Sequence, residues 1–159
     1  MFASEKSPFA AAVKAAAQEA RQRGDRRIGT EHLLLGLLSD PGSTTSRALG
    51  VDLATARAAL ADLDTAALRA IGLDVGQAPQ TGPRRHPPVP VTALATGARA
   101  AINHTIKTTT RKNRNAQAPV QLLLALLTQR EPDPVAQLLN HLGVDRPAVQ
   151  AHIDQVSAY

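Results

Sequence analysis

Glu31 and His32 place a carboxylate next to an imidazole, within the stretch "IGTEHLLLGLL". A carboxylate that orients an imidazole is a common arrangement for general acid–base catalysis. Adjacent residues of a helix, however, point about 100° apart and do not face one another. We therefore expect His32 to be a locally hydrogen-bonded histidine at the start of a helix, and not one half of a catalytic pair.

No other pattern in the sequence predicts catalysis, and none predicts a bound metal or cofactor. The chain has no cysteine, which excludes disulfides and thiolate metal sites, and it has no H-E-x-x-H motif. Its five histidines lack the spacing of metal ligands. No glycine fingerprint for a dinucleotide is present, and no G-x-x-x-x-G-K-[ST] phosphate loop. The sequence thus predicts a protein that is not an enzyme.

The composition is typical of a globular cytoplasmic protein. With 159 residues, 43% of them hydrophobic and 19% charged, the chain suits one domain or two small subdomains that share a core. The N-terminal stretch carries charges at Glu5, Lys6 and Lys14 and lacks the apolar region of an export signal. No apolar run reaches the roughly 18 residues that a membrane-spanning helix needs. We therefore expect no membrane partner.

The net charge of +5 is compatible with nucleic-acid binding, because Lys and Arg side chains that neutralise phosphates release counterions. The basic residues are nevertheless spread over three places, residues 21–27, 84–85 and the "KTTTRKNR" segment at 107–114. An aromatic content of 2% leaves little ring surface for stacking on unpaired bases. A solvated basic surface is favoured, and nucleic-acid binding is kept as the alternative function.

The hydrophobic pattern is helical in almost every segment, and nowhere does it show the sustained alternation of a strand. Caps and helix breakers then set the limits of the predicted helices. In the first half these are 8–23, 31–39 with Thr30 as N-cap, 46–49, a helix from the cap Asp52 to about Leu63, and a short helical piece after it. In the second half they are 96–109, 119–129 with Pro119 in the first turn, 134–142, and a helix from the cap Asp145 to about Ser157.

The two halves of the chain are copies of one another, separated by a Pro- and Gly-rich linker at 72–91. "HLLLGLLSD" (32–40) matches "QLLLALLTQ" (121–129), and "LGVDLATARAAL" (49–60) matches "LGVDRPAVQAHI" (142–153). Such copies usually pack about a pseudo-twofold axis and cover each other's leucine faces. The predicted fold is all-α, with about eight helices in two pseudo-twofold-related four-helix repeats. The repeats comprise residues 1–71 and 92–159 of a single unit, 1–159.

Three stretches resemble the double-repeat N-terminal domain of Clp unfoldases, most closely the ClpC type. They are "MF" at the start, "IGTEHLLLGLL" at 28–38 and "LGVDL" at 49–53, and the resemblance covers essentially the whole chain. It implies a helical bundle that binds substrates, adaptor proteins or phosphoarginine-marked proteins and delivers them to an attached ATPase ring. Because no phosphate loop is present, we expect either an excised domain or a free-standing one, and the departures from the family pattern favour a free-standing domain. It would act as an adaptor or decoy, or as a regulator that packs on a ClpC-type unfoldase.

The resemblance assigns Glu31 to a phosphoarginine pocket, where its carboxylate would bind the guanidinium group. The alternative role of Glu31 is to complement the positive end of a helix dipole. Two positions depart from the family pattern. Lys6 replaces a threonine near the pocket, and Val120 replaces the glutamate of the second copy. One intact phosphoarginine site is therefore expected at most.

The resemblance also implies an apolar groove where the first helices of the two halves meet. In the family it holds peptides and cyclic-peptide antibiotics. Leu94 replaces a phenylalanine and Asn103 a glutamate, so that the groove has less ring surface and one negative charge fewer. The alternative role of Phe2 is to close the helical core. The matching positions are Phe2, Val13, Leu94, Arg99, Ile102, Asn103 and Ile106.

Overall fold

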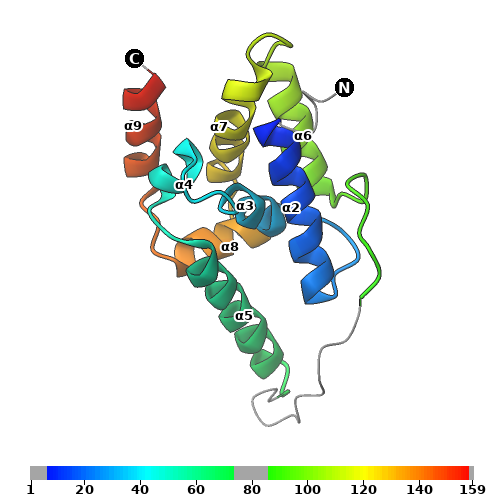
Figure 1. Cartoon of the computed structure of the whole chain (residues 1–159). Coiled ribbons are helices and arrows are strands. Elements are labelled where there is room, and N and C mark those ends of the chain that lie inside the picture. Colours follow the sequence, from blue (N-terminus) through cyan, green and yellow to red (C-terminus); the bar gives the residue numbers. More distant parts are fainter. Residues whose placement is uncertain (1–6, 74–85, 158–159) are drawn as a thin grey trace.

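Helices make up the regular structure of the protein. The computed structural model describes residues 7–73 and 86–157 (Figure 1). Within these ranges every regular element is an α-helix, which confirms the all-α prediction. The helices are α2 (Pro8–Arg23), α3 (Thr30–Leu37), α4 (Thr44–Leu49), α5 (Leu53–Ala70), α6 (Thr96–Thr108), α7 (Arg114–Leu127), α8 (Pro134–His141) and α9 (Arg146–Ser157).

Local capping explains the limits of α2, which lie where the sequence predicts them. The Ser7 hydroxyl accepts a hydrogen bond from the backbone N–H of Ala10, and proline occupies the first turn. At the other end Gly24 adopts a left-handed conformation with φ 79°. A residue without a side chain takes up that conformation at little cost, so the chain can leave the helix there.

Two helices differ from the prediction. Helix α5 runs without interruption from Leu53 to Ala70, because this stretch contains neither glycine nor proline and nothing in it breaks a helix. Helix α7 begins at Arg114, so Pro119 lies inside the helix and not in its first turn. Pro119 has no N–H to donate to the carbonyl four residues earlier, so the helix lacks one backbone hydrogen bond there.

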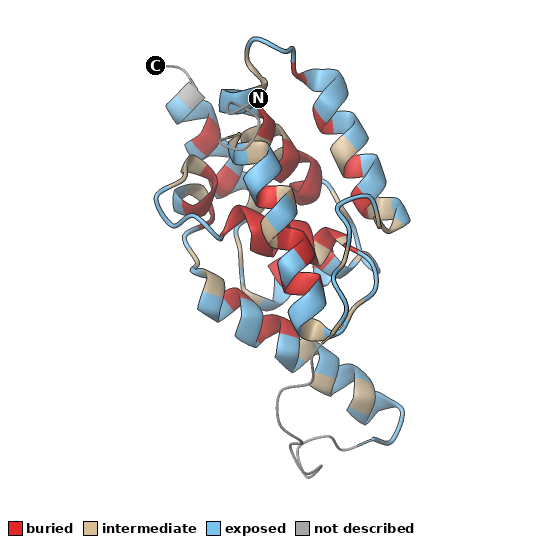
Figure 2. Cartoon of the chain, turned by 45° about the vertical axis from the view of Figure 1, so that its right-hand side comes forward, coloured by how far each residue is buried: buried red, intermediate tan, exposed pale blue. Residues whose placement is uncertain are grey.

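Helices α3 and α7 form the centre of the molecule. Leu33, Leu34 and Leu35 of α3 are fully buried, as are Leu122 and Leu123 of α7. A helix that is hydrophobic all round has to be covered on all sides. Figure 2 shows the buried residues gathered in the middle of the bundle and exposed residues on the outer faces of the surrounding helices.

The surrounding helices pack on this centre in the crosswise manner that the duplication predicts. Helix α2 packs on α3 and α6 packs on α7, while α2 also contacts α7 and α6 contacts α3. Likewise α4 packs on α9, and its counterpart α8 packs on α5. Each contact between a helix of the first repeat and a helix of the second is thus matched by a contact between the two equivalent helices. The two four-helix repeats share one core.

A short backbone bridge fixes the segment that precedes α6. The Ile28 N–H donates to the Ala93 carbonyl at 2.8 Å, and the Ala95 N–H donates to the Ile28 carbonyl at 2.9 Å. These bonds form an isolated parallel bridge between Ile28 and Leu94. Ile28 is fully buried, which anchors the bridge in the core. Ile28, which lies just before α3, therefore fixes the position of Leu94.

Candidate functional site

An apolar groove lies between α2 and α6, the first helices of the two repeats. Its volume is about 580 Å³, and both helices and the segment that precedes α6 line it. Among the described residues Lys14 is the only lining residue with an ionisable side chain. The lining residues are Phe9, Ala10, Ala11, Val13, Lys14, Ala15, Gln18, Val91, Leu94 and Ile102.

Helix α2 forms one wall of the groove because its opposite face is made of small residues. Ala12, Ala16 and Ala20 lie on that face at helical spacing, and all three are buried. There α2 approaches α3 so closely that a methyl group at Gly36 would overlap the carbonyl oxygen of Ala12. The other face of α2 borders the groove and carries the larger side chains of Phe9 and Val13.

The structure brings together three of the residues that the resemblance assigns to the groove. Val13, Leu94 and Ile102 line it, and each is partly buried. Arg99, Asn103 and Ile106 share the face of α6 that carries Ile102, but they are exposed and do not line the cavity. Phe2 lies outside the described residues.

Two lining residues were not predicted. Phe9 lies one helical turn before Val13 on the same face of α2, and this spacing was the available signal. Val91 belongs to the irregular segment before α6, where no periodic pattern exists. The aromatic surface that Leu94 lacks is thus partly supplied by Phe9.

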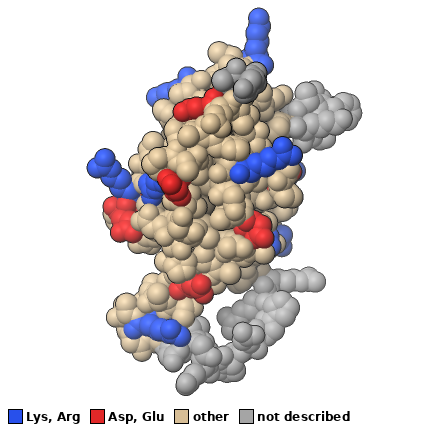
Figure 3. Space-filling view, turned by 90° about the vertical axis from the view of Figure 1, so that its left-hand side faces the viewer, with Lys and Arg blue, Asp and Glu red and all other residues tan. Residues whose placement is uncertain are grey.

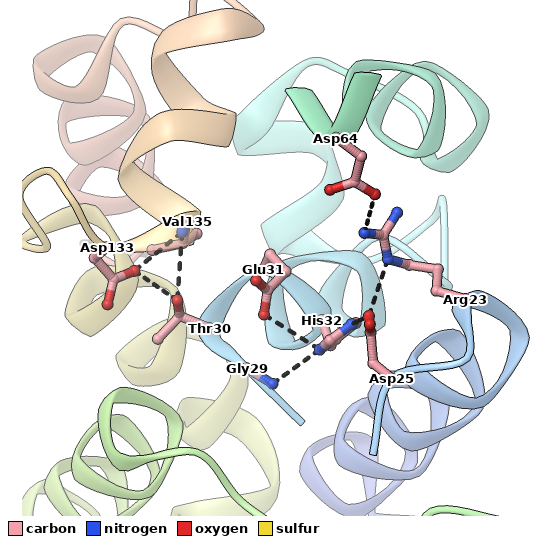
Figure 4. A network of polar contacts seen from close by, with 9 residues as sticks. All are labelled: Arg23, Asp25, Gly29, Thr30, Glu31, His32, Asp64, Asp133 and Val135. Atoms are coloured by element: carbon pink, nitrogen blue, oxygen red, sulfur yellow. Dashed lines mark hydrogen bonds and ion pairs between the residues drawn. The ribbon is translucent and has the colours of Figure 1, made fainter. Parts of the chain in front are cut away.

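A polar pocket lies at the start of α3 (Figure 4), with a volume of about 490 Å³. His32 forms its inner wall and is 3% exposed. Its Nδ1 accepts the Gly29 N–H at 2.8 Å, and its Nε2 lies 2.8 Å from a carboxylate oxygen of Asp25. The prediction of a locally hydrogen-bonded histidine is confirmed.

The prediction that the side chains of Glu31 and His32 do not meet is wrong. The Glu31 carboxylate folds back over Gly29 toward the helix start, and its Oε1 lies 3.2 Å from His32 Nδ1. Burial raises the pKa of Glu31, while the charge of His32 opposes that shift and the charge of Asp25 adds to it. Because the Nδ1 lone pair already accepts the Gly29 N–H, the contact is more favourable when the Glu31 carboxyl group carries a proton than when it is ionised.

Thr30 does not cap α3 as the sequence predicted, since Gly29 is the N-cap. The Thr30 side chain is buried, and its hydroxyl donates to an Asp133 carboxylate oxygen at 2.5 Å. The Val135 N–H in turn donates to the same carboxylate oxygen at 3.0 Å and to the Thr30 hydroxyl oxygen at 3.3 Å. This network connects the start of α3 in one repeat to the start of α8 in the other (Figure 4).

Arginine side chains occupy the other side of the polar pocket. Arg23 bridges two carboxylates, with Nε 3.2 Å from Asp25 and Nη2 2.5 Å from Asp64 on α5. Arg26 and Arg27 also line the pocket and are exposed. In the described residues no cluster of three or more His, Asp or Glu side chains is arranged to hold a metal ion. The pocket is therefore a network of ion pairs with two further cations at its rim.

Comparison with known proteins identifies the class. Residues 6–84 match the family described as the Clp repeat (R) N-terminal domain. Residues 6–84 thus belong to this family, whose members bind substrates and adaptors of Clp systems. No protein of curated function matches the chain. Among the described helices none has the length and the apolar character that a membrane crossing requires.

Proposed function

We propose that the protein is a non-catalytic binding module that takes up a peptide segment in the groove between α2 and α6. The segment would belong to a Clp substrate, an adaptor or a cyclic-peptide natural product. The main support is the groove itself, an apolar cavity of about 580 Å³ between helices that pack on α3 and α7 rather than extensively on each other. This volume lies within the range of about 300–1,000 Å³ found for ligand pockets.

As an adaptor or decoy the protein would act by mass action. It would offer apolar peptides a groove like that of an unfoldase, and so lower their free concentration. As a regulator it would instead pack on a ClpC-type ring. Adding the protein to a reconstituted Clp protease separates these roles. A decoy inhibits less as the peptide concentration rises, whereas a regulator changes degradation at saturating peptide.

A matched pair of variants on α6 tests the groove. Ile102 lines it, whereas Ile106 lies one turn further along the same helix and is 42% exposed. Removing three buried carbons costs about 1–2 kcal/mol of binding free energy, which is about 5- to 30-fold in Kd. We expect this loss of peptide affinity for Ile102→Ala and near wild-type binding for Ile106→Ala, measured by fluorescence anisotropy. Equal affinities of the two variants would contradict the groove assignment.

Phosphoarginine binding in the polar pocket is a second candidate function. Its support is that Glu31, Arg26 and Arg27 line the same pocket, so a carboxylate for a guanidinium group and cations for a phosphate lie together. Glu31 would first have to leave His32, with which it is in contact. Calorimetry with free phosphoarginine tests this function. Wild-type binding that Glu31→Ala abolishes supports it, and absence of wild-type binding refutes it.

Nucleic-acid binding through residues 107–114 receives less support. Arg114 donates from Nε to the Thr109 hydroxyl at 3.2 Å, and from Nη2 to the backbone carbonyls of Ile106 and Thr109, so it holds the end of α6 in place. A phosphate-binding surface would lose affinity steeply as salt rises, whereas an apolar groove would respond little. A salt titration with duplex DNA therefore separates the two functions.

A further inference from the structure

We infer that the groove selects apolar peptide segments that carry acidic side chains. This inference rests on the proposed function of the groove and adds the chemistry of its ligand. It follows from the signs of the charges on the three elements that form the walls, namely α2, α6 and the segment 86–95. These elements hold several basic residues and a single acidic one, Glu19.

Glu19 does not offer its charge to the groove. Its side chain is 8% exposed, and both carboxylate oxygens lie 3.1 Å from Nε of Arg57 on α5. A carboxylate held by a guanidinium group in this way is neutralised locally. The described walls thus present no free negative charge to a ligand.

Two basic residues of the walls are, in contrast, available, whereas Arg23 at the end of α2 is paired with Asp25 and Asp64. Lys14 lines the groove from α2, and Arg99 lies on α6 one turn before Ile102 with its side chain exposed. In the described part of the chain neither residue belongs to an ion pair. Arg21 lies at the end of the same wall, where its Nε donates to the His86 carbonyl at 2.9 Å.

The position of Lys14 suits recognition of a carboxylate beside an apolar side chain. A lysine can lay its aliphatic stem along an apolar ligand and keep its ammonium group in water. A charge at the rim of an apolar cavity is also screened less than a charge on an open surface. A ligand whose Asp or Glu side chains flank its apolar residues therefore gains binding free energy from Lys14 on one wall and from Arg99 on the other.

The opposite side of the molecule and the polar pocket do not share this charge distribution. Figure 3 shows the opposite side of the molecule, the side of α4, α5 and α9 in Figure 1, where acidic and basic side chains are interspersed. The polar pocket contains the carboxylates of Asp25, Glu31, Asp64 and Asp133. The excess of positive charge on its walls thus distinguishes the groove from the polar pocket.

The test uses three peptides with identical apolar residues and with Glu, Gln or Lys at the same flanking positions. Anisotropy titrations at low and moderate salt give the affinity of each. One exposed ion pair changes affinity up to about fivefold, so we expect the Glu peptide to bind about three- to fivefold tighter than the Gln peptide. The Lys peptide should bind more weakly than both, and salt should reduce these differences.

Variants with reversed charge assign the effect to the groove. Lys14→Glu should reverse the order, so that the Lys peptide binds best. Lys112→Glu changes the net charge equally but lies in the turn between α6 and α7, and it should keep the wild-type order. Circular dichroism checks that both variants are folded.

Three outcomes would overturn the inference. Equal affinities of the three peptides would refute the selectivity for acidic residues but not the proposed binding of peptides in the groove. The same change of order in Lys14→Glu and Lys112→Glu assigns the effect to net charge alone. Absence of binding by every peptide refutes the groove function and the inference together.

Discussion

Substitution of Gly36 by alanine should strongly destabilise the protein, although alanine is the better helix former. Gly36 lies in α3, where alanine instead of glycine contributes about 1 kcal/mol of helix stability. An alanine methyl group at this position, however, would overlap the Ala12 carbonyl oxygen and lie 3.0 Å from the Ala16 nitrogen. Both atoms belong to the backbone of α2, so no side-chain rotation can relieve the overlap.

The magnitude follows from the movement that α2 would have to make. Overpacking of a core costs typically 1–3 kcal/mol, and a clash with a backbone belongs at the upper end of that range. After subtraction of the helix-propensity gain, we expect a net loss of about 2 kcal/mol in the free energy of unfolding. In a protein of this size such a loss lowers Tm by roughly 4–8 °C. Because α2 is a wall of the groove, peptide affinity should fall as well.

Urea unfolding followed by circular dichroism measures the effect, with Gly42→Ala as the matched control. Gly42 lies in a turn, where the nearest atom to an added methyl group is a flexible Asp40 oxygen at 3.5 Å. We expect Gly42→Ala to change stability by less than about 0.5 kcal/mol. A Gly36→Ala protein that is as stable as wild type would show that α2 does not pack on α3 as described.

Three further substitutions test the core and the polar network. Leu122→Ala removes a fully buried side chain from the shared core and should cost about 2–5 kcal/mol while unfolding stays a single transition; two separate transitions would refute a common core. Thr30→Val should cost about 1–3 kcal/mol, because the carboxylate of Asp133 loses a donor, whereas Thr65→Val, on the surface of α5, should be nearly neutral in urea unfolding. Glu31→Gln tests the raised pKa of Glu31. The folded protein holds that proton more tightly than the unfolded chain does, so wild-type stability falls as pH rises through the folded pKa. At low pH the variant and the wild type should therefore have similar free energies of unfolding, and with rising pH the variant should become the more stable of the two. A difference in stability that decreases with rising pH would contradict this reasoning.

The sequence predicted the helices well where local signals define them. Ser7, Pro8 and Gly24 set the limits of α2 by capping and backbone conformation, and these depend only on neighbouring residues. The leucine-rich stretches predicted α3 and the second half of α7, and these stretches lie inside because their apolar side chains have to be covered. The repeat pattern also predicted the crosswise packing of the two halves.

The remaining features depend on partners that lie far away in the chain. Thr30 was assigned a capping role because its contact with Asp133 spans 103 residues and leaves no local pattern. The contact between Glu31 and His32 depends on the conformation of the Glu31 side chain, which the hydrophobic periodicity of the sequence does not predict. For the groove, the resemblance supplied Val13, Leu94 and Ile102, while Val91 could not be found without the bridge that places its segment.

Mapping of peptide binding by NMR tests the central claim most directly. An apolar peptide with acidic flanking residues is titrated into the ¹⁵N-labelled protein, and the backbone amide shifts are followed. We predict that the largest changes fall on the residues that line the groove, among them Val13, Leu94 and Ile102. Changes centred on Glu31 and Arg26 of the polar pocket, or no changes at saturating peptide, would contradict the claim.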